Sequence, residues 1–374
     1  MPARLNNLCG DRRMECTVVI PTYNRPNHLK RILSYYHQYG KDLPVLIADS
    51  SSEENKRLNR ETVTSFNDSC FTYLDKYDPS ANHVNKIFDA LEHVNSKYCV
   101  LCADDDFVTP NGIRESTDFL DLNPGFTAAH GVQAAFTLKF AAGREPQFRC
   151  RQHLGPSHIQ LKPEDRLIYK VADDDHTSFY AVHSTDLIKM VFTEILNMTC
   201  YMPFTGDLTY RSDLLFAELL IVWLPAIYGK EKCLDTLFSV REDCTPAHLR
   251  RSDITMRDFM KDKKYKENRQ NFSDCVSLHL SEQSGISIAE AHEIVDKEVS
   301  VYIDKSISFG GRVVAAFNLP NWMDQAGRKL YRTIPRLFTR YYSIDALPSK
   351  YFNDYSQIRL QVLSNAREVY GINR

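Results

Sequence analysis

Residues 98–110 read YCVLCADDDFVTP, an apolar run followed at once by three consecutive aspartates. The run at 98–102 predicts a short buried strand, and Pro110 and Asn111 open a new segment. At neutral pH, three adjacent carboxylates repel one another unless a cation or hydrogen-bond donors compensate them. Oxygen ligands of this kind suit Mg²⁺ or Mn²⁺, ions that commonly also carry the phosphates of a substrate. For the acidic motif taken alone, a turn exposed to solvent is the alternative.

Strand and helix patterns alternate around this motif, from residue 16 to residue 122. Apolar runs predict strands at 16–21, 44–48, 70–74 and 98–102, and apolar residues at helical spacing predict helices around 29–36 and 84–94. This alternation predicts an α/β fold with a doubly wound, mainly parallel, Rossmann-like sheet. Further strands are expected at 126–136, 179–182 and 234–240, and helices at 187–198 and from Gly206-Asp207 onward. The intervening residues 140–170 predict a variable stretch.

Polar and acidic residues follow three of the predicted strands. These residues are Thr22 to Arg25 after the first strand, Asp49 and Ser50 after the second, and Asp104 to Asp106 after the central one. In doubly wound sheets, ligands bind outside the carboxyl ends of the strands. Neither a GxGxxG motif nor a GxxxxGK[ST] motif occurs, which disfavours a dinucleotide cradle and a P-loop. We therefore expect phosphates to be held through a metal ion.

Composition excludes several classes of protein. The chain has 374 residues, of which 43% are hydrophobic and 25% are charged, and its formal net charge of −2 gives no global field that favours nucleic acid. Ten scattered cysteines without a paired CxxC framework predict reduced thiols and a cytoplasmic protein. No signal peptide or membrane-spanning run is recognised, so a soluble or peripheral protein is expected.

The composition shifts beyond Pro246. We expect an N-terminal tail at 1–15, a catalytic domain at 16–248 and a helical C-terminal region at 249–374. In this last region Ser287 and Glu290 have the spacing of a capping box. Residues 328–341 form a basic amphipathic pattern, which predicts either a helix packed on the protein itself or peripheral contact with an anionic membrane.

The motifs VVIPTYNRP, Asp49 at a strand end and ADDDFVTP, in this order, resemble GT-A fold glycosyltransferases of the family 2 type, over about residues 15–245. The resemblance implies a nucleotide-sugar donor, UDP-linked, with Mn²⁺ or Mg²⁺ under its diphosphate. It also implies transfer with inversion to a hydroxyl of a glycan, lipid-linked or protein acceptor. No nucleic-acid partner is implied.

The resemblance also assigns roles to individual residues. It implies donor binding by Pro21, Thr22, Tyr23, Arg25, Asp49, Asn85, Lys86, Asp104 and Asp105. Within this set, the first four residues form the loop that wraps the nucleoside, and Asp49 accepts a hydrogen bond from the base. It implies metal ligation by Asp105, Asp106 and His248, and a catalytic base at Asp207.

The chain departs from the family pattern at three places. Asp49 lies in A-D-S-S rather than D-D-G-S, Ala103 takes the first position of the acidic motif, and Gly206 replaces the glutamate before the base. A second acidic run, residues 173–176, is a competing metal or acceptor site. Two other functions stay open, a catalytically silent nucleotide- or carbohydrate-binding subunit and a nucleotidyltransferase.

Overall fold

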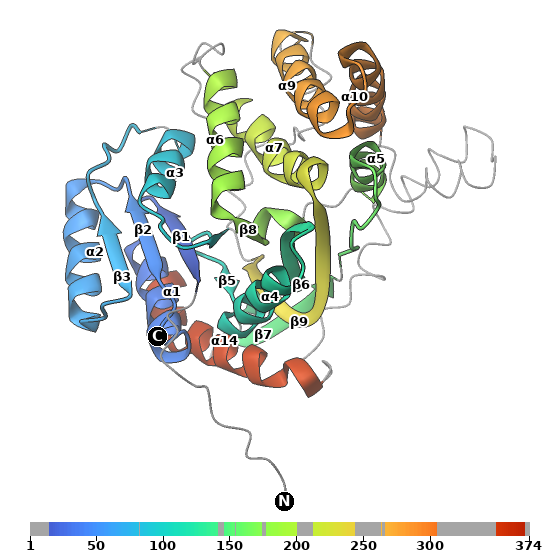
Figure 1. The fold of residues 1–374 in the computed structure, drawn as a ribbon. Helices are drawn as coiled ribbons and strands as arrows, with labels where there is room; N and C mark the ends of the chain where they lie inside the picture. Colours follow the sequence, from blue (N-terminus) through green and yellow to red (C-terminus); the bar gives the residue numbers. More distant parts are fainter. Residues whose placement is uncertain are drawn as a thin grey trace, which may run out of the picture.

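A nine-stranded mixed sheet forms the centre of the chain, with helices on both faces (Figure 1). The computed structural model describes residues 15–81, 83–140, 146–153, 155–173, 177–199, 212–243, 263, 266–304 and 349–370. The strand order is β3-β2-β1-β4-β8-β6-β9-β5, and β7 pairs with β6. The expected doubly wound α/β fold is confirmed.

The first half of the sheet is parallel. It comprises β1 (Cys16–Thr22), β2 (Val45–Asp49), β3 (Phe71–Leu74) and β4 (Tyr98–Leu101), connected by α1 (Pro26–Tyr39), α2 (Glu53–Phe66) and α3 (His83–Glu92). β1, β2 and β4 are apolar because both of their faces are covered, whereas the edge strand β3 is only partly buried. Val18 and Ile20 of β1 lie in one core, while Val19 lies in the other. Each of the four strands was predicted within two residues of its observed bounds.

The second half of the sheet contains antiparallel pairings that the sequence did not predict. It comprises β5 (Phe107–Val108), α4 (Pro110–Leu122), β6 (Phe126–Lys139), β7 (Gln147–His153), α5 (Pro163–Asp173), η1 (Thr177–Tyr180), β8 (Val182–Ser184), α6 (Thr185–Thr199), α7 (Ser212–Tyr228) and β9 (Lys230–Glu242). β8 runs antiparallel to both β4 and β6, whereas β6 and β9 pair in parallel.

Two expectations for this half are corrected. The expected variable stretch at 140–170 contains β7 and most of α5, which bury Phe148, Cys150 and Leu167. The expected strand at 179–182 is a 3₁₀ turn through Tyr180, and β8 starts only at Val182. The turn withdraws Tyr180 from the sheet and leaves its hydroxyl free to reach the acidic motif.

The C-terminal helices pack on both faces of the sheet. α9 (Lys266–Ser284) and α10 (Ile288–Asp304) join the core that contains α6 and α7, and they lie at the top of Figure 1. The turn η4 (Ser349–Tyr351) and the helices α14 (Phe352–Ser364) and α15 (Ala366–Tyr370) join the other core. The Glu290 N–H donates to Ser287 Oγ at 3.2 Å, one of the two hydrogen bonds of the expected capping box. The expected domain boundary at 248 and the basic pattern at 328–341 lie outside the described residues.

No described helix is both long and apolar enough to cross a membrane.

A buried arginine links the acidic motif to α1, β9 and α15. Arg31, on α1, is fully buried and donates to the Glu242 carboxylate at 2.6 Å and to the Asp105 carbonyl at 2.9 Å. It also donates to the Tyr370 hydroxyl at 3.3 Å, and its guanidinium lies 5.3 Å from the centre of the Phe107 ring. One side chain therefore joins α1, the acidic turn, β9 and α15.

Replacing this arginine should destabilise the fold strongly. Arg31→Met leaves the Glu242 carboxylate, whose side chain is only 6% exposed, without its cation. Breaking a buried ion pair in this way costs about 3–5 kcal/mol, which should appear as a lower urea midpoint in tryptophan fluorescence. Arg57→Met is the matched control, because Arg57 forms an exposed i,i+4 pair with Glu61 worth about 0.5 kcal/mol. Equal midpoints for the two variants would contradict the role given to Arg31.

Candidate functional site at the carboxyl edge of the sheet

A cavity of about 430 Å³ opens at the carboxyl ends of β1 and β4. Its wall includes four groups of residues from distant parts of the chain: the β1–α1 loop, α3, the acidic motif and the turn η1. The lining residues are Pro21, Thr22, Tyr23, Arg25, His83, Lys86, Ile87, Leu101, Cys102, Ala103, Asp104, Asp105, Phe179, Tyr180, Glu218 and Arg241. This is the edge at which the sequence predicts ligand binding.

Strand register brings the predicted donor residues together. β1 lies between β2 and β4, so Thr22 is paired with Asp49 on one side and lies next to the acidic motif on the other. The Thr22 hydroxyl donates to Asp104 Oδ2 at 2.6 Å. Pro21, Thr22, Tyr23 and Arg25 all line the cavity, as expected. Tyr23 is 52% exposed there, an apolar ring in position to contact a ligand.

Asn24 fixes the shape of this loop. It adopts a left-handed backbone conformation, with φ of 54°. Its side-chain oxygen accepts from the Ser52 N–H at 2.8 Å and from Asn55 at 3.0 Å, and its own N–H donates to Ser51 at 2.8 Å. The loops after β1 and β2 are thereby joined, and Arg25 is held at the start of α1. Sequence reasoning did not single out Asn24, although Asn is among the few residues that adopt this conformation readily.

Arg25 bridges the first two carboxylates of the acidic motif. Its Nη1 lies 2.6 Å from Asp105 Oδ2 and 3.1 Å from Asp104 Oδ1. Burial, followed by repulsion from Asp105, raises the pKa of Asp104 to about 6, although Arg25 and Thr22 oppose this shift. Asp105 is the most accessible of the three, with its side chain 25% exposed. Asp104 and Asp105 both line the cavity, as the sequence predicted for donor binding.

The Asp106 carboxylate, a predicted metal ligand, lies away from the cavity. It accepts from the Tyr180 hydroxyl at 2.6 Å and from the Glu242 N–H at 2.7 Å. Arg241 Nε lies 3.4 Å away, and the guanidinium of Arg241 lies 5.3 Å from the centre of the Tyr180 ring. Burial, followed by repulsion from Asp105, raises the pKa of Asp106 to about 6. The backbone turn therefore directs the third carboxylate into the sheet.

Asp49 is likewise enclosed. It is fully buried at the end of β2, and its two oxygens accept from the Ser51 N–H at 2.7 Å and from Asn59 and Tyr73, each at 2.6 Å. Asp49 lies beside the predicted site but does not line the cavity. In this arrangement it holds the loop after β2 in place.

Of the two donor residues expected on α3, only Lys86 reaches the cavity. Its ammonium group donates to the Thr22 carbonyl and to Ser50 Oγ, both at 2.9 Å. Asn85 is exposed and does not line the cavity. Asp207, His248 and residues 174–176 of the competing acidic run lie outside the described residues, and Asp173 ends α5.

Glu218, Tyr180 and Arg241 line the cavity although sequence reasoning missed them as site residues. Glu218 carried a signal, because it is the only charged residue between Leu214 and Tyr228, in a helix that is otherwise apolar. It is exposed, whereas the four residues that follow it are buried. Tyr180 and Arg241 carried no such signal, since their place depends on the 3₁₀ turn and on the end of β9.

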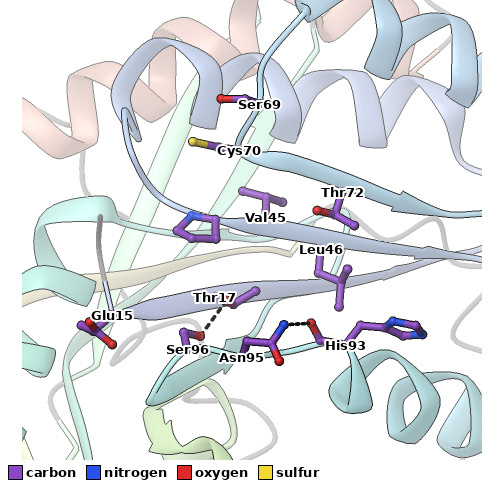
Figure 2. Close-up of a pocket in the computed structure, with 11 residues that line it drawn as sticks. Glu15, Thr17, Val45, Leu46, Ser69, Cys70, Thr72, His93, Asn95 and Ser96 are labelled. Carbon is purple, nitrogen blue, oxygen red and sulfur yellow. Dashed lines mark hydrogen bonds between the residues drawn. The ribbon is translucent and has the colours of Figure 1, made fainter. Parts of the chain in front are cut away.

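A second cavity, of about 340 Å³, lies at the opposite edge of the sheet (Figure 2). It is lined by residues at the amino ends of the strands, such as Thr17, Val45 and Thr72, and by Asn95 and Ser96. Thr17 and Ser96 are hydrogen-bonded to each other at 2.7 Å, as Figure 2 shows. This edge is not the one at which doubly wound sheets bind their ligands, and the acidic motif contributes nothing to it.

The raised pKa of Asp104 predicts a pH-dependent effect on stability. The folded chain binds the proton of Asp104 more tightly than the unfolded chain does. The stability that this proton contributes is therefore fully present below about pH 4 and is lost as the pH rises through about 6. The Asp104→Asn substitution removes this titrating carboxyl group. Relative to the wild-type chain, the variant should therefore gain about 3 kcal/mol in free energy of unfolding between about pH 4 and about pH 7, because each pKa unit is worth about 1.4 kcal/mol.

The measurement is urea unfolding in the presence of a chelator. Asp118→Asn, which replaces an exposed carboxylate on α4, is the control and should show no such gain. A constant difference between Asp104→Asn and the wild type across this pH range would show that Asp104 titrates as an ordinary carboxyl group.

Comparisons with known proteins find one family model and a set of solved structures. Residues 17–162 match the family model described as glycosyl transferase family 2. No curated protein has a sequence that matches the chain. Among solved structures, S. aureus TarS 1–349 is 13% identical, with a TM-score of 0.43, and the match covers 95% of this chain and 90% of that one. Its complex with UDP-GlcNAc is 14% identical over the same shares, with a TM-score of 0.44.

A mannosyltransferase, PcManGT from Pyrobaculum calidifontis, in complex with GDP-Man and Mn²⁺, is 12% identical, with a TM-score of 0.36 over 97% of this chain and 89% of that one. The family match contains the β1–α1 loop, Lys86 and the whole acidic motif. These are the elements that build the cavity wall around Asp104 and Asp105. Residues 17–162 therefore have the pattern of a glycosyl transferase family 2 domain, and the fold is of the GT-A type.

Proposed function

We propose that this protein is an inverting, metal-assisted glycosyltransferase that moves a sugar from a UDP-linked donor to an acceptor hydroxyl. One observation carries the proposal: Asp104 and Asp105 face the same cavity as the loop that resembles the family's nucleoside-binding segment. A nucleoside in that loop would bring its diphosphate to the two carboxylates. Such an arrangement needs a cation between the two sets of negative charges.

The residues present fit a hard divalent ion. Asp104 and Asp105 supply carboxylate oxygens, the ligands that Mg²⁺ and Mn²⁺ prefer, and would hold the ion. Arg25 already places one positive charge between these carboxylates, and its side chain is 35% exposed, so it can move when a divalent ion binds. His248 stays the predicted third ligand. When bound, the metal would stabilise the negative charge of the departing diphosphate.

The chain's own residues would orient the donor. Tyr23 offers an exposed ring at the cavity, and the Lys86 ammonium holds the Thr22 carbonyl and Ser50 in place. The role predicted for Asp49 is to accept a hydrogen bond from the nucleobase. In this structure its carboxylate accepts from the Ser51 N–H in the loop after β2. Arg241, which is exposed at the cavity, adds a further positive charge to its wall.

The predicted base is Asp207, which precedes α7. Inverting transfer is a displacement at the anomeric carbon, so a carboxylate must take the acceptor proton on the face opposite the leaving diphosphate. Its position in the sequence, shortly before the amino end of α7, supports this role. Glu218, which lies on α7 and lines the cavity, is another acidic candidate and must be tested beside Asp207.

Replacing Asp105 and Asp106 one at a time should distinguish an effect on metal binding from an effect on folding. Asp105→Ala should abolish Mn²⁺-dependent turnover of a UDP-sugar without lowering Tm, because it relieves repulsion at a partly exposed position. Asp106→Ala should instead lower the free energy of unfolding by about 1–3 kcal/mol, because it leaves the Tyr180 hydroxyl and the Glu242 N–H unpaired.

Turnover is measured as product release from a panel of UDP-, GDP- and CMP-sugars, with and without chelator. The stability of each variant is measured as its Tm. Full turnover of Asp105→Ala in chelator would exclude the metal. Binding of a nucleotide sugar without turnover under any condition would favour a silent binding subunit.

A base variant should lose rate without losing donor affinity. Asp207→Asn should lower kcat by about 10²–10⁴-fold, the usual contribution of a positioned general base, while the calorimetric Kd for the donor stays unchanged. Glu218→Gln and the Asn variants of Asp173, Asp174 and Asp175 are assayed beside it. Near-normal kcat for Asp207→Asn, with a collapse in one of the others, would assign the base to that residue instead.

A further inference from the structure

A carboxylate, a thiol and an imidazole meet between α6 and α9, outside the cavity described above. Glu194 lies on α6, and Cys275 and His279 lie one turn apart on α9. One ligand atom from each residue lies within 4.8 Å of the other two. Cys275 Sγ is 3.9 Å from Glu194 Oε2, and His279 Nε2 is 3.8 Å from Glu194 Oε1. The i,i+4 spacing puts the thiol and the imidazole on one face of the helix.

The imidazole points a buried nitrogen without a partner into this cluster. The His279 side chain is 8% exposed, and its Nε2 is a buried atom that forms no hydrogen bond within the described structure. Its Nδ1 is already engaged, at 2.7 Å from the Tyr228 hydroxyl of α7. When Nδ1 donates to that hydroxyl, Nε2 carries a lone pair directed toward the Glu194 carboxylate. In that tautomer a lone pair faces a carboxylate, and a cation between the two would satisfy both.

Hydrogen bonds within the cluster leave the Nε2 atom of the imidazole unengaged. The Cys275 thiol donates to Glu194 Oε2 at 3.9 Å. The 3.8 Å between His279 Nε2 and Glu194 Oε1 is too long for a hydrogen bond between nitrogen and oxygen. A metal ion would engage all three side chains.

We propose that Glu194, Cys275 and His279 bind a zinc ion that fastens α9 to α6. Thiolate, imidazole and carboxylate together are ligands of Zn²⁺, whereas Mg²⁺ and Mn²⁺ prefer oxygen alone. Two negative ligands, Glu194 and the Cys275 thiolate, balance the charge of the ion. The Tyr228 hydroxyl supplies the outer hydrogen bond that a metal-binding histidine usually makes through its other nitrogen.

Two of the three edges of the cluster are close to those of a tetrahedral site. Zinc bonds of about 2.0–2.3 Å place neighbouring ligand atoms about 3.3–3.6 Å apart, so the observed separations need shifts of only a few tenths of an ångström at the shorter two edges. The Glu194 side chain, which is 28% exposed, can move by that amount. With three protein ligands, the fourth position of a zinc ion is commonly taken by water.

The site lies where the C-terminal helices join the catalytic domain. α9 packs on α7 through Phe272, whose ring is 5.2 Å from that of Trp223. A zinc ion between α6 and α9 would add a second link, beside the apolar one. Its effect would be on the docking of α9, independent of the chemistry proposed for the cavity at the carboxyl edge.

Zinc binding can be measured on the full chain. After stripping with chelator and dialysis, the wild-type chain should retain one added Zn²⁺ by elemental analysis, in the presence of excess Mg²⁺ to occupy the oxygen site. Co²⁺ in place of Zn²⁺ should give near-ultraviolet absorption from thiolate-to-metal charge transfer. Both zinc retention and this band should be lost in Cys275→Ser and kept in Cys233→Ser, which changes a cysteine of similar burial on β9.

Variants of the other residues distinguish ligands from packing groups. Tyr228→Phe should lower zinc affinity about 10–100-fold, the usual effect of removing an outer hydrogen bond. His279→Gln should abolish the Tm increase that zinc gives the wild-type chain, with circular dichroism used to establish that the variant is folded. The proposal is overturned if the wild-type chain retains no zinc, or if retention and the cobalt band survive Cys275→Ser.

Discussion

Three carboxylates in consecutive positions must each be compensated separately, and the arrangement of the acidic motif follows from that requirement. Asp104 accepts from Thr22 and Arg25, Asp105 from Arg25, and Asp106 from Tyr180 and the Glu242 N–H. No single cation could serve all three, because the turn directs the third into the sheet. The donors come from four different elements, so the motif can form only when the sheet around it is complete.

This dependence couples the site to the rest of the fold. Arg31 holds the backbone of the acidic turn through the Asp105 carbonyl and holds the end of β9 through Glu242. Glu242 in turn presents the N–H that fixes Asp106. The same arginine reaches Tyr370 near the end of the described chain, so α15 closes over the network that shapes the cavity. Stability and ligand geometry therefore rest on one set of buried polar contacts.

The sequence predicted those parts of the fold that local patterns determine, above all the parallel strands and their ends. Parallel strands buried on both faces appear as apolar runs, and their ends therefore located Thr22, Asp49 and the acidic motif correctly at one edge. It missed β7, whose alternating polar residues resemble a loop, and it gave no sign that Tyr180 and the Glu242 N–H hold the Asp106 carboxylate. The direction of Asp106 depends on partners 74 and 136 residues away, a long-range effect that the local sequence does not contain.

The two proposed cation sites differ in donor chemistry, so each would select its own ion. At the carboxyl edge the donors are carboxylate oxygens beside a movable arginine, which suits a hard ion that must also engage phosphates. Between α6 and α9 the donors are a thiol, an imidazole and one carboxylate, held by helices that pack through apolar side chains. Donor chemistry, rather than affinity alone, selects the metal at each site. The two sites would then serve different ends, one for turnover at the cavity and one for the attachment of the C-terminal helices.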